Sequence, residues 1–161
     1  MQEQVVVRPA RIEDAEPIAH LSGQLGYPAS AEDVRERLTH IVGEDDHVVY
    51  VAESLRERVI GWIYIYIYIY LYIYLCPLVE MPLQAEIGGL VVDERHRSQG
   101  VGRRLLEQAE RWAAGKGCSA VMVHSNVVRE AAHRFYIRLG YRLIKTQRVF
   151  TKSLKEKPHG A

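Results

Sequence analysis

The chain has 161 residues, of which 48% are hydrophobic and 25% charged, values typical of a single globular domain with a sizeable core. Its formal net charge of +1, with acidic and basic residues spread along the chain, gives no electrostatic reason to expect a nucleic acid or an anionic membrane as partner. Two cysteines, Cys76 and Cys118, form no CxxC or Cys/His cluster, so no metal site or disulfide framework is expected.

The N-terminal segment has no apolar core of signal-peptide length, and the apolar run at residues 63–75 is too short for a membrane span. We therefore expect a soluble protein of the reducing cytoplasm that binds a small molecule.

The first third of the chain predicts one strand followed by two helices. "QVVVRPA" reads as a short strand, and the next segment as a helix that begins near Ile12 and is broken by Gly26. A second helix opens at Ser30 or the next residue, with Asp33 placed as in a capping box, and ends at Gly43.

A tyrosine stripe dominates the next segment, because residues 61–75 read "GWIYIYIYIYLYIYL". Strict alternation predicts a strand with isoleucines on one face and tyrosines on the other. Together with "HVVYVAES" and the charged turn "LRER", it predicts an antiparallel hairpin whose second strand runs from Gly61 to about Tyr68. An uncovered aromatic strand would aggregate, so we expect the longer run at 63–75 to serve mainly as core and homodimer surface, with one or two of its tyrosines as candidates to line the small-molecule site.

The second half of the chain predicts alternating strands and helices. "AEIGGLVVD" is a strand in which Gly88 and Gly89 mark a bulge or a close approach of another backbone. An amphipathic helix follows and stops at Gly115 and Gly117, then come a strand in "CSAVMVHS" and a helix in "REAAHRFYIRLG". "YRLIKTQRVFTKSL" predicts a final strand or strand pair, which gives one domain over residues 1–154 and a flexible tail over 155–161.

The segment "ERHRSQGVGRRLL" joins a strand to a helix through a loop with Gly100 and Gly102 at the junction. An anionic ligand is favoured here by the free N–H groups of the first helical turn and by the helix dipole. Nearby arginines add positive charge, among them Arg97, Arg103 and Arg104. From this loop alone, an ordinary helix start that happens to contain glycines is as probable as an anion-binding site. The loop lacks the Lys-Ser/Thr of a P-loop, and no GxGxxG follows the first strand.

Two spaced motifs resemble the GCN5-related N-acetyltransferase (GNAT) family. The family's phosphate loop has the pattern Arg/Gln-x-x-Gly-x-Gly/Ala after a strand of Leu-x-Val type, and residues 97–102 match it. The family also has a helix with the pattern Ala-x-x-x-Tyr-x-x-x-Gly-Phe/Tyr. Its positions are matched by Ala132, Tyr136, Gly140 and Tyr141. The resemblance covers nearly the whole chain. It implies an α/β (α+β) fold with a mixed, mostly antiparallel sheet of about six or seven strands, four flanking helices, and a splay between strands 4 and 5.

The same resemblance implies acetyl-CoA as cosubstrate and direct attack of a primary amine on its thioester in a ternary complex. The acceptor would be a small molecule or a protein, and no metal is implied. The implied cofactor contacts are Leu90, Val91, Val92, Arg97, Ser98, Gln99, Gly100, Val101, Gly102 and Arg103, together with Asn126 or Arg129. Arg129 stands where many members carry an asparagine that contacts the cofactor. Asn126, three residues earlier, either makes that contact instead or only caps the helix.

Two side chains would carry the catalysis that the resemblance implies. Tyr136 matches the general acid that protonates the departing thiolate, although it also lies on an apolar helical stripe and could be a core tyrosine. Glu86 lies where some members carry a base, and its alternative is a solvated carboxylate. His124 and His133 could titrate near neutrality, with packed or surface histidines as the more common case.

Two other functional classes remain open at this point. A non-catalytic CoA-binding or self-assembling module would keep the fold without needing Tyr136 and a base. A phosphate-loop protein for another nucleotide would differ in ligand preference.

Overall fold

A computed structural model describes residues 4–56, 58–68 and 82–154. The chain divides into two compact units, Met1–His124 and Ser125–Ala161. In the described part no helix is both long and apolar enough to cross a membrane. The expected tail at 155–161 lies outside the described residues.

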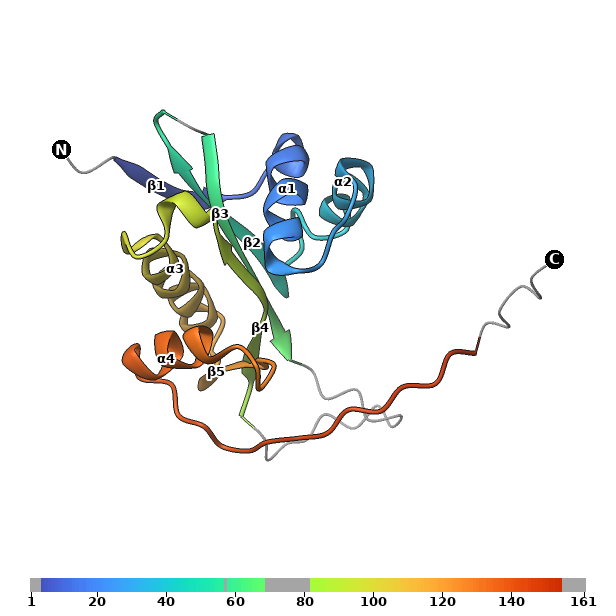
Figure 1. Ribbon diagram of the computed structural model, residues 1–161, viewed down its shortest axis with the longest axis vertical. Helices are drawn as coiled ribbons and strands as arrows, with labels where there is room; N and C mark the ends of the chain where they lie inside the picture. Colours follow the sequence, from blue (N-terminus) through green and yellow to red (C-terminus); the bar gives the residue numbers. More distant parts are fainter. Residues whose placement is uncertain (1–3, 57, 69–81, 155–161) are drawn as a thin grey trace. The chain divides into compact units, whose positions relative to one another are not determined.

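The first unit is built on one five-stranded sheet, in the order β1-β2-β3-β4-β5 (Figure 1). Neighbouring strands are antiparallel except β4 and β5, which are parallel. The expected mixed, mostly antiparallel sheet is thus confirmed, with β3 between β2 and β4 as the hairpin predicted. The strands are β1 (Val5–Pro9), β2 (His47–Ser54), β3 (Arg58–Tyr68), β4 (Gln84–Val92) and β5 (Ala120–Val123).

Helices cover both faces of this sheet. On one face α1 (Ala15–Leu25) contacts β3 and β4 and packs beside α2 (Ala31–Thr39), whereas α3 (Val101–Gly115) lies on the other face (Figure 1). Short 3-10 helices, η1 (Ile12–Asp14) and η2 (Glu94–His96), precede α1 and α3.

The helix ends follow local sequence signals. Gly26 closes α1 in the left-handed conformation with φ 95°, and Ser30 with Asp33 forms the expected capping box of α2. The second helix ends at Thr39, four residues before the predicted Gly43. Gly43 itself has φ 93°, so it marks the end of the following turn and not of the helix.

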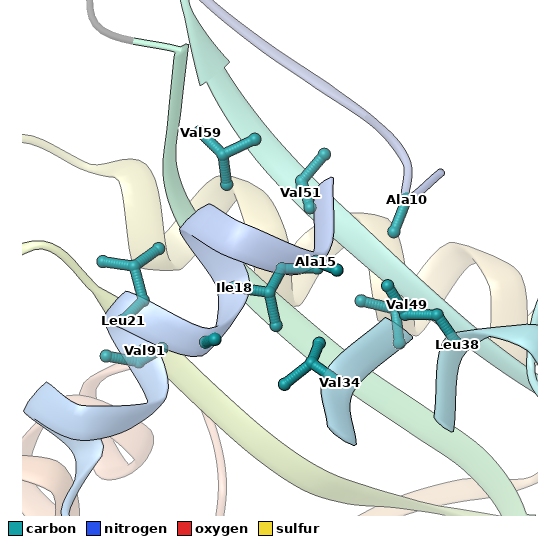
Figure 2. Close-up of a cluster of buried hydrophobic side chains, with 11 residues drawn as sticks. Ala10, Ala15, Ile18, Leu21, Val34, Leu38, Val49, Val51, Val59 and Val91 are labelled. Carbon is teal, nitrogen blue, oxygen red and sulfur yellow. The ribbon is translucent and has the colours of Figure 1, made fainter. Parts of the chain in front are cut away.

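Aliphatic side chains from α1, α2 and the sheet form the core on one face (Figure 2). Ile18 and Leu21 of α1 pack with Val34 of α2 and with Val49 and Val51 of β2. Burial of such side chains contributes roughly 1.5 to 3 kcal/mol each. This core fixes the position of α1 on the sheet.

The tyrosine stripe divides its faces as the alternation predicts. Ile63 and Ile65 are fully buried, and Gly61 in the same alternation faces Leu105 of α3, so the isoleucine face packs on that helix. Tyr64 and Tyr66 lie half-buried on the opposite side, here called the tyrosine face. The predicted dimer surface beyond residue 68 lies outside the described residues.

The second unit contains α4 (Glu130–Arg138), which ends before Gly140 at φ 91°. The expected final strand or strand pair at 141–154 is wrong, because the structure assigns no strand there, and the sheet has five strands instead of six or seven. Residues with strand propensity form strands only where a neighbouring strand supplies hydrogen bonds. The apolar residues of this segment also come as adjacent pairs, Leu143 with Ile144 and Val149 with Phe150, which place no single apolar face on a strand.

Arg8 joins β1 to the start of α1 through a buried ion pair. Its Nη1 and Nη2 donate to Asp14 at 2.8 and 2.9 Å, and its Nε donates to Glu53 at 2.7 Å. Burial would raise the pKa of Asp14, but the hydrogen bonds from Arg8 and from the Arg11 backbone outweigh it and lower the pKa. A lowered pKa stabilises the folded state above the ordinary aspartate pKa, and this stability is lost as pH falls through the folded value.

Replacement of Arg8 by Met is therefore expected to destabilise the protein by about 3 kcal/mol at neutral pH, since it leaves a buried carboxylate without its cation. Urea unfolding at pH 7 and pH 3 measures the effect, which should shrink at the lower pH. The Arg8→Met/Asp14→Asn double variant is the control and should recover much of the loss. Equal destabilisation at both pH values would contradict the role given to the ion pair.

Gly88 and Gly89 allow aromatic rings of β3 to lie across β4. A Cβ on Gly88 would come within 2.6 Å of Tyr64 Cδ1, and one on Gly89 within 2.7 Å of Trp62 Cη2. The expected close approach is therefore made by side chains, and the register shift between Tyr64 and Ile65 confirms the expected bulge.

Gly88→Ala is expected to lower the free energy of unfolding by about 1 to 3 kcal/mol, because the tyrosine ring must move. Gly23→Ala is the matched control. Gly23 lies inside α1 with nothing within 4 Å of a built Cβ. This variant should be more stable than the parent by about 0.5 to 1 kcal/mol. Thermal unfolding distinguishes the two, and equal stability of both variants would contradict the ring contact.

Candidate active site

The polar loop between β4 and α3 ends in a helix start with exposed backbone donors. Ser98 and Gly100 adopt positive φ of 61° and 81°, and the first helical hydrogen bond runs from Arg104 N to Gly100 O at 3.1 Å. The N–H groups of residues 101–103 therefore have no acceptor within the helix. Space around Gly100 is open, with nothing within 4 Å of a built Cβ. These features suit an anionic group held by backbone amides.

Side chains of the loop hold its shape. Arg97 Nε donates to Val92 O at 3.1 Å, and Gln99 Nε2 donates to Arg95 O at 3.2 Å. The predicted cofactor residue Arg97 thus ties the loop to the end of β4, whose backbone belongs to the same predicted set.

Two arginines of the first turn of α3 have different partners. Arg103 Nε donates to Glu107 at 2.8 Å on the exposed helix surface. Arg104 Nη1 donates to Val5 O at 2.9 Å, so this guanidinium is engaged on β1. Of the two, only Arg103 was expected to contact a cofactor.

Asp93 anchors the start of the loop. Its buried carboxylate accepts from Arg95 N at 3.0 Å, and its own N–H donates to Ile60 O at 2.8 Å. Burial would raise the pKa of Asp93, but hydrogen bonds from Arg95 lower it, so the group stays ionised. Asp93 was not among the predicted site residues; its place directly after a buried strand was the available signal.

Strands β4 and β5 part beside this loop. Their ladder runs from Gln84 opposite Ala120 to Ile87 opposite Val123, whereas β4 continues alone to Val92. The backbone of Leu90, Val91 and Val92 therefore has no β5 partner along this edge.

Glu86 lies on β4 just before the two strands part, and it is buried. Its Oε1 accepts a hydrogen bond at 2.6 Å from Nδ1 of His124, which directly follows β5. Its Oε2 is buried and has no hydrogen-bond partner among the described residues. The structure thus brings together two residues that the sequence analysis considered one by one, and it places Glu86 away from bulk solvent.

The tyrosine face continues from Glu86 across the sheet. Tyr66 lies opposite Glu86 in the register and therefore shares its face. The ring centroids of Tyr64 and Tyr66 are 5.4 Å apart. The Tyr64 hydroxyl lies 3.1 Å from Nδ1 of His47, and Nε2 of the same histidine lies 3.0 Å from Oδ1 of Asp46. Burial raises the pKa of Tyr64. This face presents aromatic rings and carboxylates, groups that suit a cationic amine.

Tyr136 belongs to α4 in the second unit. Its ring packs edge-on against Phe135 at 5.2 Å and against Tyr141 at 5.5 Å. Burial raises the pKa of Tyr136 to about 12, with a smaller opposing influence of Arg129. The phenol is therefore protonated at neutral pH and available as a proton donor.

The turn before α4 is built around Asn126. Its Oδ1 accepts from Val128 N at 3.1 Å, while its backbone carbonyl accepts from Arg129 N and His133 Nε2, both at 3.0 Å. Arg129 is the N-cap residue of α4. Asn126 thus forms the turn that precedes α4 but is not its N-cap residue, and its contact with a cofactor stays a prediction.

The predicted site residues are distributed over both units. In the first unit, Glu86 and residues 90–92 lie on β4, and the loop and helix start at residues 97–103 follow that strand along the chain. Asn126, Arg129 and Tyr136 belong to the second unit. In the described part of the chain no group of three or more His, Cys, Asp or Glu side chains could hold a metal ion.

The sheet with helices on both faces, the two parting strands and the helix start define a mixed α/β fold, in which a buried carboxylate lies on the strand that leads to that helix start. Comparison with known proteins agrees with this class. The profile of the Acetyltransferase (GNAT) family matches residues 12–141. The chain therefore belongs to the GNAT acetyltransferase family.

Similar proteins include enzymes with different acceptors. An aminoglycoside N(6')-acetyltransferase type 1 of Serratia marcescens is 28% identical over 120 residues, which is 74% of this chain and 78% of the relative. An aminoalkylphosphonate N-acetyltransferase of Salmonella typhimurium is 41% identical over 69 residues, 43% of this chain and 44% of that relative. The solved structure of AAC(6')-Iy with a CoA-containing bisubstrate analogue has a TM-score of 0.78 at 17% identity, covering 93% of this chain and 99% of that one.

Proposed function

We propose that the protein is an N-acetyltransferase that transfers the acetyl group of acetyl-CoA to a primary amine of a small molecule. The observation that carries the proposal is Glu86, a buried carboxylate beside the parting strands, one oxygen of which has no hydrogen-bond partner in the part of the chain that the structure describes. Membership of the GNAT family supports the reaction type, and the named relatives acetylate amines.

The loop at residues 97–102 would hold the pyrophosphate of acetyl-CoA on the N–H groups of the first turn of α3. The positive φ of Gly100, the open space around it and the absence of a side-chain cap on α3 fit such a ligand. The backbone of Leu90, Val91 and Val92, which lies beyond the β4–β5 ladder, would pair with the pantetheine arm like an added strand. Arg103, with Asn126 or Arg129, would add further contacts.

Acetyl-CoA supplies a thioester, whose carbonyl carbon forms a C–N bond with the amine while its C–S bond breaks. Glu86 would take a proton from the acceptor ammonium at Oε2 and free the nitrogen lone pair for attack. Tyr136 would give its phenolic proton to the departing sulfur. The nitrogen loses two protons in total; one ends on the sulfur after Tyr136 is reprotonated, and the other leaves to solvent.

The acceptor class follows from the tyrosine face and from the relatives. Tyr64, Tyr66 and Glu86 offer aromatic rings and a carboxylate to an ammonium group. Aminoglycosides and aminoalkylphosphonates are the first compounds to test, since the two relatives act on them.

We also propose a cytoplasmic homodimer that uses the stripe at residues 63–75. Its aromatic, uncharged sequence is the support for this assembly. The mass in solution tests it, because a monomer at micromolar concentration would contradict the dimer.

Thermal unfolding with acetyl-CoA, ATP or NAD tests the cofactor. A ligand at about 100 times its dissociation constant stabilises the folded state by roughly 2.7 kcal/mol. We expect the unfolding temperature to rise with acetyl-CoA and to stay unchanged with ATP or NAD. Gly100→Val, which places a branched residue at φ 81°, should reduce that rise because the loop must change conformation.

The control is Gly115→Ala at the far end of α3, where a built Cβ has nothing within 4 Å. Its response to acetyl-CoA should equal that of the parent. Stabilisation by ATP or NAD without stabilisation by acetyl-CoA would contradict the proposed function.

A further inference from the structure

The pair formed by Glu86 and His124 joins a buried group to an exposed one. The two side chains meet at 2.6 Å between Oε1 and Nδ1, yet the Glu86 side chain is 10% exposed and the His124 side chain 60%. The two residues are 38 positions apart in the sequence; Glu86 lies in β4 and His124 directly follows the parallel strand β5, so the contact depends on the register of β4 and β5.

The chemistry of the two groups, and not the distance between them, assigns the donor and the acceptor. An ionised carboxylate only accepts, so Nδ1 of His124 carries the hydrogen in this contact. The carboxylate is then held at one oxygen, and Oε2 remains buried with no partner among the described residues. A buried acceptor without a donor destabilises the folded state, because it has lost its hydrogen bond to water. A donor that arrives with a ligand would supply the missing hydrogen bond.

We propose that His124 is the positioning residue for Glu86: its Nδ1–H holds Oε1 so that Oε2 faces the ammonium group of the acceptor. This inference rests on the proposed function and deepens it. Glu86 is the group that receives the proton, while His124 acts through Glu86 and touches neither substrate.

The fold supports this division of roles. Glu86 faces Tyr66 across β3–β4 and Met122 across β4–β5, so the strands fix its backbone on both sides. Without a hydrogen bond at Oε1 the carboxylate could still rotate about its terminal side-chain bond. His124 supplies that hydrogen bond.

Steady-state kinetics of three His124 variants with acetyl-CoA and the best amine tests the proposal. We expect His124→Ala to lower kcat by about 100-fold while the KM for acetyl-CoA stays unchanged, because a small misplacement of a reacting group has an effect of this order. His124→Asn should recover most of the rate, since its amide N–H occupies the place of Nδ1–H. His124→Gln should not, because its longer side chain places the amide beyond that position. His20→Asn, an exposed histidine of α1, is the matched control and should match the parent.

Nuclear magnetic resonance of the imidazole nitrogens gives a readout that does not depend on turnover. Neutral His124 should carry its proton on Nδ1 in the parent, and Glu86→Leu should remove this preference. His124→Ala with parental kcat, or His124→Asn as slow as His124→Ala, would overturn the positioning role and leave the acetyltransferase proposal intact. A parent enzyme that releases no CoA with any amine would overturn the proposed function and this inference with it.

Discussion

Glu86→Gln is expected to lower kcat by about 10²- to 10⁴-fold, the contribution typical of a general base. Glutamine keeps the size of the side chain and can still accept a hydrogen bond from His124, but it cannot take a proton from an ammonium group. An amine resembling lysine has a pKa near 10.4, so nearly all of it is protonated at neutral pH and needs a proton acceptor. Initial rates of CoA release at pH 7 measure the effect.

The control for this substitution is Glu53→Gln, a partly exposed carboxylate on β2 that pairs with Arg8. It should leave turnover unchanged. The stabilisation of Glu86→Gln by acetyl-CoA should also equal that of the parent, because Glu86 is not among the proposed cofactor contacts. Parental kcat in Glu86→Gln would remove Glu86 from the mechanism.

Tyr136→Phe is expected to lower kcat by about 10²- to 10⁴-fold while acetyl-CoA still binds, because only the phenolic proton is lost. The pKa of Tyr136, raised to about 12 by burial, keeps this proton in place throughout the neutral range. The loss should therefore be nearly independent of pH between 6 and 9. Rates across this range, with acetyl-CoA binding measured separately, provide the check.

Tyr141→Phe is the matched control, since this residue packs against Tyr136 in the same unit at a ring distance of 5.5 Å. It should turn over at the parental rate. If Tyr136→Phe also kept that rate, Tyr136 would be a packing residue of its helix and another group would protonate the sulfur.

Local patterns predicted most of the fold. The alternation of isoleucine and tyrosine determined the faces of β3, because side chains of a strand alternate whatever the partner strands are. The capping box at Ser30 and the glycine after α1 determined where helices begin and end. Both signals act within a few residues, so they too do not depend on distant parts of the chain. The glycines Gly88 and Gly89 predicted a bulge or a close approach of another backbone, but not the rings of Tyr64 and Trp62, because the ring positions depend on the neighbouring strand.

Features that depend on long-range pairing were less accessible. Glu86 and His124 meet through the parallel register of β4 and β5, which no local pattern specifies. The segment at 141–154 failed as a predicted strand, since strand propensity alone provides no hydrogen-bonding neighbour. The loop at residues 97–102 and the helix start after it could be predicted because its glycines and the helix are adjacent in sequence; an anion site there stays a prediction.

Acetyl transfer itself is tested most directly by incubating the protein with acetyl-CoA and single amines, an aminoglycoside and an aminoalkylphosphonate among them, and measuring CoA release together with the product mass. The account predicts that at least one primary amine becomes heavier by one acetyl group, with equimolar CoA released and the rate abolished in the Glu86→Gln/Tyr136→Phe double variant. If acetyl-CoA binds to the protein but no amine is acetylated, acetyl transfer is contradicted and the protein is a CoA-binding module.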